Sequence, residues 1–484
     1  MKNTIICSIA VLSAALLAAC TETTRIWPEE GESKAYVEVS SQKVIFDADG
    51  GNAVITVATN ADGWDYAAEG DWFTVARQDG NALLVETLIN AGAETLTGKL
   101  TVSAEKNGET VSQEVALVQR AERSVNLSAE GTANCYIART GGVYKFDASV
   151  KGNGGGDGVS DYIANYGLAI EDGAFAELLW ESRHDGDKTM SREIIDGAPI
   201  YRGGYVTFST GRSEGNAVIA VKDIKGNIVW SWHIWVCNDE ITAHDHIDSE
   251  GKVAAVIMDR NLGAETLHAA STSSRGFYYE WGRKDPFPWP DAEIVYGEGV
   301  AHDSFGPFYL GDAAADATIA WATAHPTTLM GEVAGPQDSW LAAPAPYLWG
   351  NGSDGHTATQ RSLKSIYDPC PLGWRVPPSE AWGLEDFQLL NFEDDSGWYI
   401  RMNGHYTTYP FTGYLYPGTQ GWVYTALSGC FAWSNTPGIR SQNGTTTVDA
   451  ARAGCLQLDH FGTVTLNMSR CQAFACPVRC IKDE

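Results

Sequence analysis

Basic residues are scarce in this sequence. Its 484 residues include 33 lysines and arginines against 61 acidic residues, which gives a net charge of −28. A chain with this balance repels polyanions, so nucleic acid and anionic membrane surfaces are disfavoured as partners, whereas a neutral ligand is compatible with it. The motif C-x-x-C does not occur, so we expect no thiolate-bound metal, and nothing else in the sequence calls for a cofactor.

The apolar run from Ile5 to Ala19 is too short to cross a membrane comfortably. It leads into Leu17-Ala18-Ala19-Cys20, a pattern typical of a lipoprotein cleavage box. Residues 1–20 are therefore predicted to be a signal peptide, with Cys20 as the lipidation site and polar residues 21–35 as a tether. The alternative is a soluble export signal in which Cys20 is incidental.

Length and aromatic content predict a large multidomain protein. At typical domain sizes 484 residues make about three domains, and 17 Trp, 20 Tyr and 15 Phe supply core residues. Over residues 36–121, short β-branched runs alternate with turns such as Asp49-Gly50-Gly51-Asn52. Their even spacing predicts an antiparallel immunoglobulin-like β-sandwich that lacks the immunoglobulin disulfide.

The same segment resembles a known domain family. The turn Asp49-Gly50-Gly51-Asn52, the pair Trp64 and Trp72, and the closing run Val115-Ala116-Leu117-Val118-Gln119 are similar to the BACON domain of Bacteroidetes proteins. The resemblance covers about a fifth of the chain.

Residues 122–245 are predicted to form a second β-rich domain. Its clearest element is a hairpin in which Ala217 to Val221 and Ile228 to Cys237 flank the turn Lys225-Gly226-Asn227. Apolar residues alternate along the second strand, so one face is expected to point to the core. Cys135 and Cys237 are the only cysteines of this block, and we predict a disulfide between them.

Residues 246–484 have longer, aromatic-rich loops and two predicted helices. Asp312 can cap an alanine-rich run through Ala324, and Ser379 can cap a helix over Glu380 to Leu390. The chain as a whole is thus predicted to be multidomain and mainly β, with an α+β C-terminal domain.

Five ordered motifs in this last block resemble one family, the Fibrobacter succinogenes major paralogous domain, which is similar to C-type lectin folds. The motifs are Met258-Asp259-Arg260-Asn261-Leu262-Gly263, Tyr278-Tyr279-Glu280-Trp281-Gly282-Arg283, Cys370-Pro371-Leu372-Gly373-Trp374-Arg375-Val376-Pro377, Ala432-Trp433-Ser434-Asn435-Thr436 and Pro477-Val478-Arg479-Cys480. The resemblance implies a C-type-lectin-like domain and a disulfide between Cys370 and Cys480. For the remaining cysteines we favour the pairs Cys430 with Cys455 and Cys471 with Cys476, although eight cysteines allow 105 pairings.

Lectin-like folds usually bind ligands on long loops, and the segment from Trp398 to Tyr424 carries eight tryptophan and tyrosine rings among glycines. Glycine favours turns on the surface, and rings stack on the C–H faces of neutral sugars. The alternative is that these rings form the core of the domain. The predicted ligand-binding residues are Trp398, Tyr406, Tyr409, Tyr414, Tyr416, Trp422, Tyr424 and Asn435.

Three patterns in the sequence resemble parts of an enzyme or a metal site. Gly211-Arg212-Ser213-Glu214-Gly215 matches a nucleophile elbow, but a strand rather than a helix is predicted after it. His244 and His246 with Asp248 lie at a domain junction, and the carboxylates of residues 393–395 suit a solvated surface. The triplets by which calcium-dependent lectins hold calcium are missing, and Trp433-Ser434-Asn435 matches one of them only in part. We therefore expect no metal, and from the three patterns above we expect no catalytic residue.

These patterns favour a non-catalytic lipoprotein that binds glycans or mediates adhesion, resembling a fimbrial tip component. Its expected partners are a glycan or a host or cell-surface protein, and its lipid anchors it to the outer membrane. The cell surface is favoured, since stacked sandwiches ending in a lectin-like module suit a stalk with a binding tip. The periplasmic face is the alternative, because residues 21–25 lack an acidic cluster resembling surface-export signals. A carbohydrate-active enzyme and a structural envelope protein without a ligand are the competing functions.

Overall fold

The computed structural model describes residues 34–483 with gaps. The segments outside the description are 1–33, 79–80, 155–167, 184–193, 249, 269–270, 289–292, 297–300, 303–316, 332–338, 351–363, 383–387, 392–395, 403–404, 419–420, 425–428 and 484. The predicted signal peptide, Cys20 and most of the tether therefore lie outside the described residues. Within the described residues, no helix has the length and apolarity needed to span a membrane.

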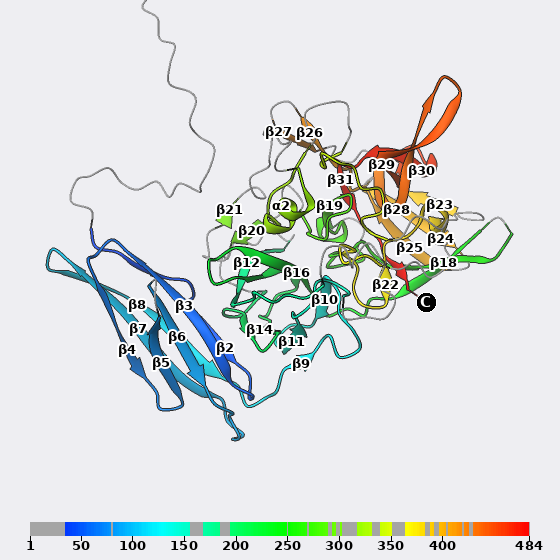
Figure 1. Cartoon of the computed structure of the whole chain (residues 1–484). Helices are drawn as coiled ribbons and strands as arrows, with labels where there is room; N and C mark the ends of the chain where they lie inside the picture. Colours follow the sequence, from blue (N-terminus) through cyan, green and yellow to red (C-terminus); the bar gives the residue numbers. More distant parts are fainter. Residues whose placement is uncertain are drawn as a thin grey trace, which may run out of the picture.

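The described chain is mainly β and is built from several sheets (Figure 1). The first eight strands pack as two sheets in the orders β1-β3-β6-β5 and β2-β8-β7-β4. These strands are β1 (Val37–Val39), β2 (Lys43–Phe46), β3 (Gly51–Thr59), β4 (Trp64–Glu69), β5 (Phe73–Gln78), β6 (Ala82–Thr87), β7 (Leu96–Lys106) and β8 (Glu109–Gln119). We call this part the sandwich. It was predicted as antiparallel, and every pairing is antiparallel except the parallel pair β2–β8.

Alternation of side chains produces the sandwich core. Along β3, residues Ala53, Ile55 and Val57 are buried while their neighbours Val54 and Thr56 are exposed, as period-two strand geometry requires. The predicted turn before β3 depends on Gly50, whose φ is 75° and whose Cβ would lie 2.5 Å from the Leu88 carbonyl oxygen.

The second block has a six-stranded sheet and a four-stranded sheet. The first has the order β10-β16-β15-β12-β20-β21 and the second the order β13-β14-β11-β9. The strands are β9 (Val125–Asn126), β10 (Cys135–Ala138), β11 (Val143–Asp147), β12 (Phe175–Arg183), β13 (Ile200–Arg202), β14 (Tyr205–Ser209), β15 (Gly215–Lys222), β16 (Ile228–Val236), β20 (Glu293–Tyr296) and β21 (Ala301–His302). The predicted hairpin is present as the antiparallel pair β15–β16. Both faces of β16 are buried from Trp230 onward, although only one was expected to be.

The sandwich and the second block are in direct contact. The side chain of Ile200 in β13 is 5% exposed and belongs to the hydrophobic core of the sandwich. The Ala198 amide donates to the Lys43 carbonyl at 2.9 Å, and the Lys43 ammonium lies 2.8 Å from the Asp196 carboxylate. The ion pair is half exposed and adds little, so apolar burial of Ile200 is the main stabilising contact.

Four further sheets are formed by residues from 243 onward. Their orders are β17-β18-β32-β22, β19-β31-β26-β27, β23-β24-β25 and β28-β29-β30. The strands are β17 (Ala243–Ile247), β18 (Val253–Met258), β19 (Tyr278–Glu280), β22 (Trp374–Arg375), β23 (Gln388–Asn391), β24 (Gly397–Met402), β25 (His405–Pro410), β26 (Leu415–Gly418), β27 (Gly421–Tyr424), β28 (Gly429–Gln442), β29 (Thr445–Asp459), β30 (Val464–Cys471), β31 (Ala475–Pro477) and β32 (Ile481–Lys482).

Helices are short in the described part of this block. They are the 3-10 helices η1 (Thr272–Ser274) and η2 (Ser379–Trp382) and the α-helix α2 (Ile319–Ala324). The side chain of Thr318 caps α2, while the predicted cap Asp312 lies outside the described residues. The helix predicted over Glu380 to Leu390 is wrong. In the described part of this range, η2 forms at the start and residues Gln388–Asn391 pair with β24 at the end, so tertiary pairing overrides local helix propensity there.

One large hydrophobic core joins the second block to the C-terminal block. It includes Trp230 and Trp232 from β16, Trp281 after β19, Trp433 from β28 and Val478 after β31. The boundary predicted between residues 245 and 246 therefore falls within β17 and beside a shared core, not between two separate cores.

Candidate binding site

The segment from Trp398 to Tyr424 is largely strand. It contributes β24 to β27, although its glycines were expected to disfavour regular structure. Backbone pairing of β24 with both β23 and β25 places alternate side chains of β24 against the core. Some of the predicted binding residues are consequently buried.

Trp398 and Tyr409 were predicted to bind a ligand, and this prediction is wrong because both are core residues. Trp398 is 9% exposed and donates its indole N–H to the Asp459 carbonyl at 2.9 Å. Tyr409 is 2% exposed, its ring lies 4.0 Å from the Arg479 guanidinium, and its hydroxyl lies 3.3 Å from Nε2 of His246. Neither ring presents a face to solvent.

Asn435 is also incorrectly predicted as a ligand-binding residue. It is 8% exposed, and its backbone N–H donates to the Pro377 carbonyl at 2.8 Å. The neighbouring Trp433 is fully buried and donates its indole N–H to the Tyr279 carbonyl at 2.8 Å. The segment Trp433-Ser434-Asn435 therefore packs in the protein interior.

The remaining predicted residues divide into two groups. The backbone of Tyr406 lies in β25, and the backbones of Trp422 and Tyr424 lie in β27, but their side chains lie outside the described part of the chain. Tyr414 and Tyr416 are described and are partly exposed. They are the part of the predicted platform that remains as a candidate site.

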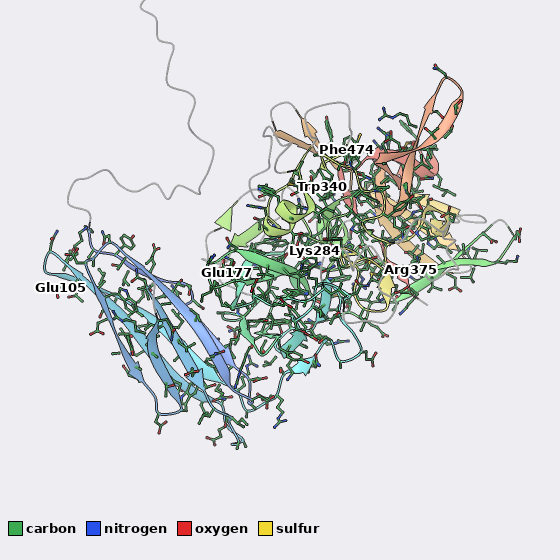
Figure 2. All side chains as sticks on the ribbon, viewed as in Figure 1. Glu105, Glu177, Lys284, Trp340, Arg375 and Phe474 are labelled. Carbon is green, nitrogen blue, oxygen red and sulfur yellow. A yellow bond between two sulfur atoms is a disulfide. The ribbon has the colours of Figure 1, made fainter. Side chains whose placement is uncertain are left out.

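Three partly exposed rings gather beside β31. Tyr414 stacks on Phe474 with centroids 5.4 Å apart and an interplanar angle of 8°, and Tyr416 lies 5.7 Å from Phe474. Buried Phe431 packs edge-on against Tyr414 at 4.9 Å and supports it from the core side. We call Tyr414, Tyr416 and Phe474 the aromatic cluster; Figure 2 labels Phe474. Sequence analysis missed Phe474 because it follows Tyr416 by 58 residues and stands alone in its segment.

A cation lies next to the aromatic cluster. The Arg470 guanidinium is 4.5 Å from the ring centroid of Tyr414 and 5.1 Å from that of Phe431. Its Nη2 donates to Oε1 of Gln457 at 2.9 Å, and no ion pair joins Arg470 to a carboxylate among the described residues. A ring platform beside an N–H donor can stack on the apolar face of a sugar and donate to its hydroxyls.

A second concave feature lies where the sandwich meets β13. A pocket of about 370 Å³ is lined by Trp72, Phe73, Asp71, Glu86 and Arg202, among others. The indole of Trp72 is held in place because its N–H donates to the Thr97 carbonyl at 3.1 Å. Pockets often form at the junction between packed units, and this one combines rings with charged groups of both signs. Sequence analysis did not predict it, because Arg202 comes from a different block.

The positions weighed for catalysis do not form a shared site. Strand β15 begins at Gly215, so no helix follows Ser213 as a nucleophile elbow requires. His246 is 1% exposed, and burial, with the nearby Arg479 cation, lowers its pKa to about 3. No group of three or more His, Cys, Asp or Glu residues that could hold a metal ion is found in the described ranges. Residues 393–395 lie outside the described ranges.

Cys370 and Cys480 form a disulfide, with Cα atoms 6.1 Å apart. This is the pair that the lectin-like resemblance implies. It joins the segment before β22 to the segment before β32, two strands that are themselves paired. The structure bonds none of the other three predicted pairs, and their six cysteines are free and buried in it.

Strand register explains why two of these pairs are not bonded. Cys135 lies opposite His233 in the parallel pair β10–β16, so Cys237 is four residues further along, about 13 Å away at 3.3 Å per residue. Cys430 lies opposite Leu458 and packs in a different core from Cys455, on the other face of the sheet. Neither separation is compatible with a disulfide.

For the third pair, the two cysteines have different partners. The Cys471 sulfur accepts from Nη1 of Arg452 at 3.5 Å. Cys476 lies in β31, opposite Tyr279. The turn between the two cysteines thus leaves each against a different strand.

These features define a mainly β protein with several sheets, a partly exposed aromatic cluster and a pocket between two blocks. No family model matches the chain, and no curated protein matches it in sequence.

Solved structures give only distant similarities. The titin domains Z1Z2 in complex with telethonin are 11% identical, with 42% of this chain and 95% of that chain covered at a TM-score of 0.15. The fibronectin(III)-like modules of Clostridium thermocellum CbhA are 12% identical, with coverages of 42% and 94% and a TM-score of 0.14. The Parabacteroides merdae β-glucuronidase is 14% identical, with coverages of 42% and 24% and a TM-score of 0.15. At these TM-scores the similarities carry no argument about this chain.

Proposed function

We propose that this chain is an exported lipoprotein, anchored through Cys20 to the outer membrane and facing the cell surface, that binds glycans without catalysis. In this proposal the sandwich is a BACON-like stalk module, and the C-terminal block is a lectin-like module that carries the binding surface. The partner is a glycan, free or on a host or cell-surface protein, so the protein acts in adhesion as a fimbrial tip component would.

The observation that supports this function best is the aromatic cluster. Apolar rings are usually buried, so three partly exposed rings in mutual contact are a costly arrangement for a folded protein unless a ligand covers them. Their faces suit the C–H surface of a pyranose, and Arg470 supplies donors at one side. The acidic net charge of the chain does not oppose a neutral glycan.

A glycan array probed with the full mature chain tests the proposal. We expect specific binding to a set of oligosaccharides, and we expect Tyr416→Ala to weaken it by about 1 to 3 kcal/mol, the range for loss of a stacked anchor. The matched control is Tyr205→Ala, since Tyr205 is a 37% exposed tyrosine on β14 of the second block and should leave affinity unchanged.

Two outcomes would contradict the proposal. Release of reducing sugar from a bound glycan would show an enzyme, and absence of binding across the array would favour a structural protein without a ligand. If binding is lost in Trp72→Ala instead of Tyr416→Ala, the site is the pocket between the blocks. The anchor is tested separately, because Cys20→Ala should move the protein out of the membrane fraction.

A further inference from the structure

Six buried cysteines are free in the structure, and two of them meet. Cys455 and Cys476 are both fully buried in the same hydrophobic core, and they are close enough for the Cys455 thiol to raise the pKa of Cys476. The Cys455 thiol also donates to the Leu456 carbonyl at 3.1 Å. The remaining four have other surroundings. For example, the Cys430 thiol donates to the Tyr409 carbonyl at 2.8 Å, and Cys471 accepts from Arg452.

Strand pairing explains why these two thiols converge. Cys455 in β29 lies opposite Trp433 in β28, whose indole N–H donates to the Tyr279 carbonyl. Tyr279 in β19 lies opposite Cys476 in β31. Trp433 and Tyr279 thus link the strands that carry the two cysteines, and all four side chains belong to the same core.

We infer that Cys455 and Cys476 form a second disulfide when the chain folds in an oxidising environment. The oxidant is a small disulfide such as oxidised glutathione. One thiol loses its proton and attacks the glutathione disulfide, which forms a mixed disulfide and releases one glutathione. The second protein thiolate then attacks the mixed disulfide and releases the other glutathione, so two protein thiols become one disulfide while one glutathione disulfide becomes two thiols.

The disulfide forms during folding, before the core closes around the two cysteines. Burial, followed by the neighbouring thiol, raises the pKa of Cys476 well above its ordinary value, so little thiolate exists once the core has closed. Both sulfurs are also out of reach of a bulky oxidant in the folded state. Once formed, the bond is protected from reduction for the same reasons.

The second disulfide would fix a segment that is already held at one end. Cys480 is bonded to Cys370, and Cys476 would be bonded to Cys455, so the chain around Phe474 would be tied to β29 as well as to the Cys370 segment. The cross-link closes a loop of chain that runs from Cys455 in β29 through β30 to Cys476 in β31. It therefore restrains the turn between Cys471 and Cys476.

Peptide mapping of the full chain tests the inference. The protein is refolded in a glutathione redox buffer, denatured with an alkylating reagent and digested with trypsin without reduction. We expect fragment 453–470 to be linked to fragment 471–479, and the linkage of 365–375 to 480–482 through Cys370 and Cys480 to serve as the internal control. Alkylated, unlinked 453–470 in a sample whose control linkage is complete would overturn the inference.

Two variants identify the partner, because fragment 471–479 contains both Cys471 and Cys476. The linkage should persist in Cys471→Ser and disappear in Cys476→Ser, and the reverse result would overturn the assignment. Hydrogen exchange of residues 471–479 should become faster in Cys476→Ser than in Cys471→Ser when both carry the intact Cys370–Cys480 bond. Equal exchange in the two variants would contradict the restraint that we assign to this bond.

Discussion

Exposure separates the aromatic residues that can meet a ligand from those that hold the fold. Trp398 and Tyr409 are both buried and donate or accept hydrogen bonds within the core. Tyr414 and Tyr416 lie close in sequence to Tyr409 but are partly exposed. Residues of one type in one short segment thus have opposite roles, and substitution should distinguish them.

Trp398→Ala should destabilise the protein by about 3 to 5 kcal/mol, because it removes a large buried ring and leaves a cavity. Tyr416→Ala should change stability by less than about 1 kcal/mol, since its ring is partly exposed. Denaturant unfolding measures both. A large loss of stability in Tyr416→Ala would place this ring in the core and remove it from the candidate site.

Stability should fall when the pH is lowered from 7 to 5. Burial lowers the pKa of His233 and of His246 to about 3, so folding excludes protons that the unfolded chain binds below its histidine pKa of about 6.5. Each residue contributes stability that is present above pH 6.5 and is lost toward pH 3, about 2 kcal/mol of it between pH 7 and pH 5. Asp368 acts oppositely, because burial raises its pKa to about 6 and its contribution is lost as the pH rises through 6.

The change in unfolding free energy between pH 7 and pH 5 should therefore be smaller in His246→Gln than in the wild type. Exposed His268 offers the matched control, and His268→Gln should keep the wild-type dependence. If His246→Gln and the wild type respond alike, His246 is not excluded from protonation in the folded state.

At the scale of elements, the three-residue strand β13 attaches the sandwich to the second block. It pairs with β14 in the second block, yet its first residue, Ile200, lies in the core of the sandwich. The polar contacts nearby, between Lys43 and Asp196, are half exposed. Docking of the sandwich consequently depends on one apolar side chain more than on charge.

Ile200→Ala should destabilise the sandwich by about 2 to 5 kcal/mol, the range for truncating a buried isoleucine. Lys43→Ala, which removes the ion pair, should cost at most about 1 kcal/mol. Hydrogen exchange of β2 and β3 in the two variants checks this order. A larger effect of Lys43→Ala would show that the polar contact dominates the docking.

At the scale of the whole molecule, one large core contains residues from both the second block and the C-terminal block. Trp230 and Trp232 from the second block pack in the same cluster as Trp281 and Trp433 from the C-terminal block. Strand β20 comes from the sequence after residue 246 but pairs with β12 in the six-stranded sheet of the second block, which also joins the two. The sandwich has its own core and is attached at its edge (Figure 1).

Fragments should reflect this division. Residues 122–484 should unfold in one cooperative thermal transition, whereas residues 246–484 alone should show none, because they lack half of the shared core. Residues 34–121 should fold alone, with reduced stability from the loss of Ile200. A cooperative transition of residues 246–484, with the Cys370–Cys480 bond formed, would show that the C-terminal block is an independent domain.

Local patterns in the sequence determined the strands of the sandwich and the hairpin β15–β16. Period-two alternation and turn residues act over a few neighbouring positions, so they can be recognised without knowledge of the partner strand. The disulfide between Cys370 and Cys480 followed from a family resemblance, since spacing alone allowed many pairings.

Long-range packing decided the rest. Gln388 to Asn391 became a strand because β24 was available to pair with it, and β16 was buried on both faces because the C-terminal block covers its second face. The burial of Trp398, the stacking of Phe474 on Tyr414, and the placement of Cys455 and Cys476 in one core depend on strands distant in the sequence. Side-chain type and spacing are local properties, whereas exposure depends on every element that packs nearby, so only the tertiary structure could separate the candidate site from the core.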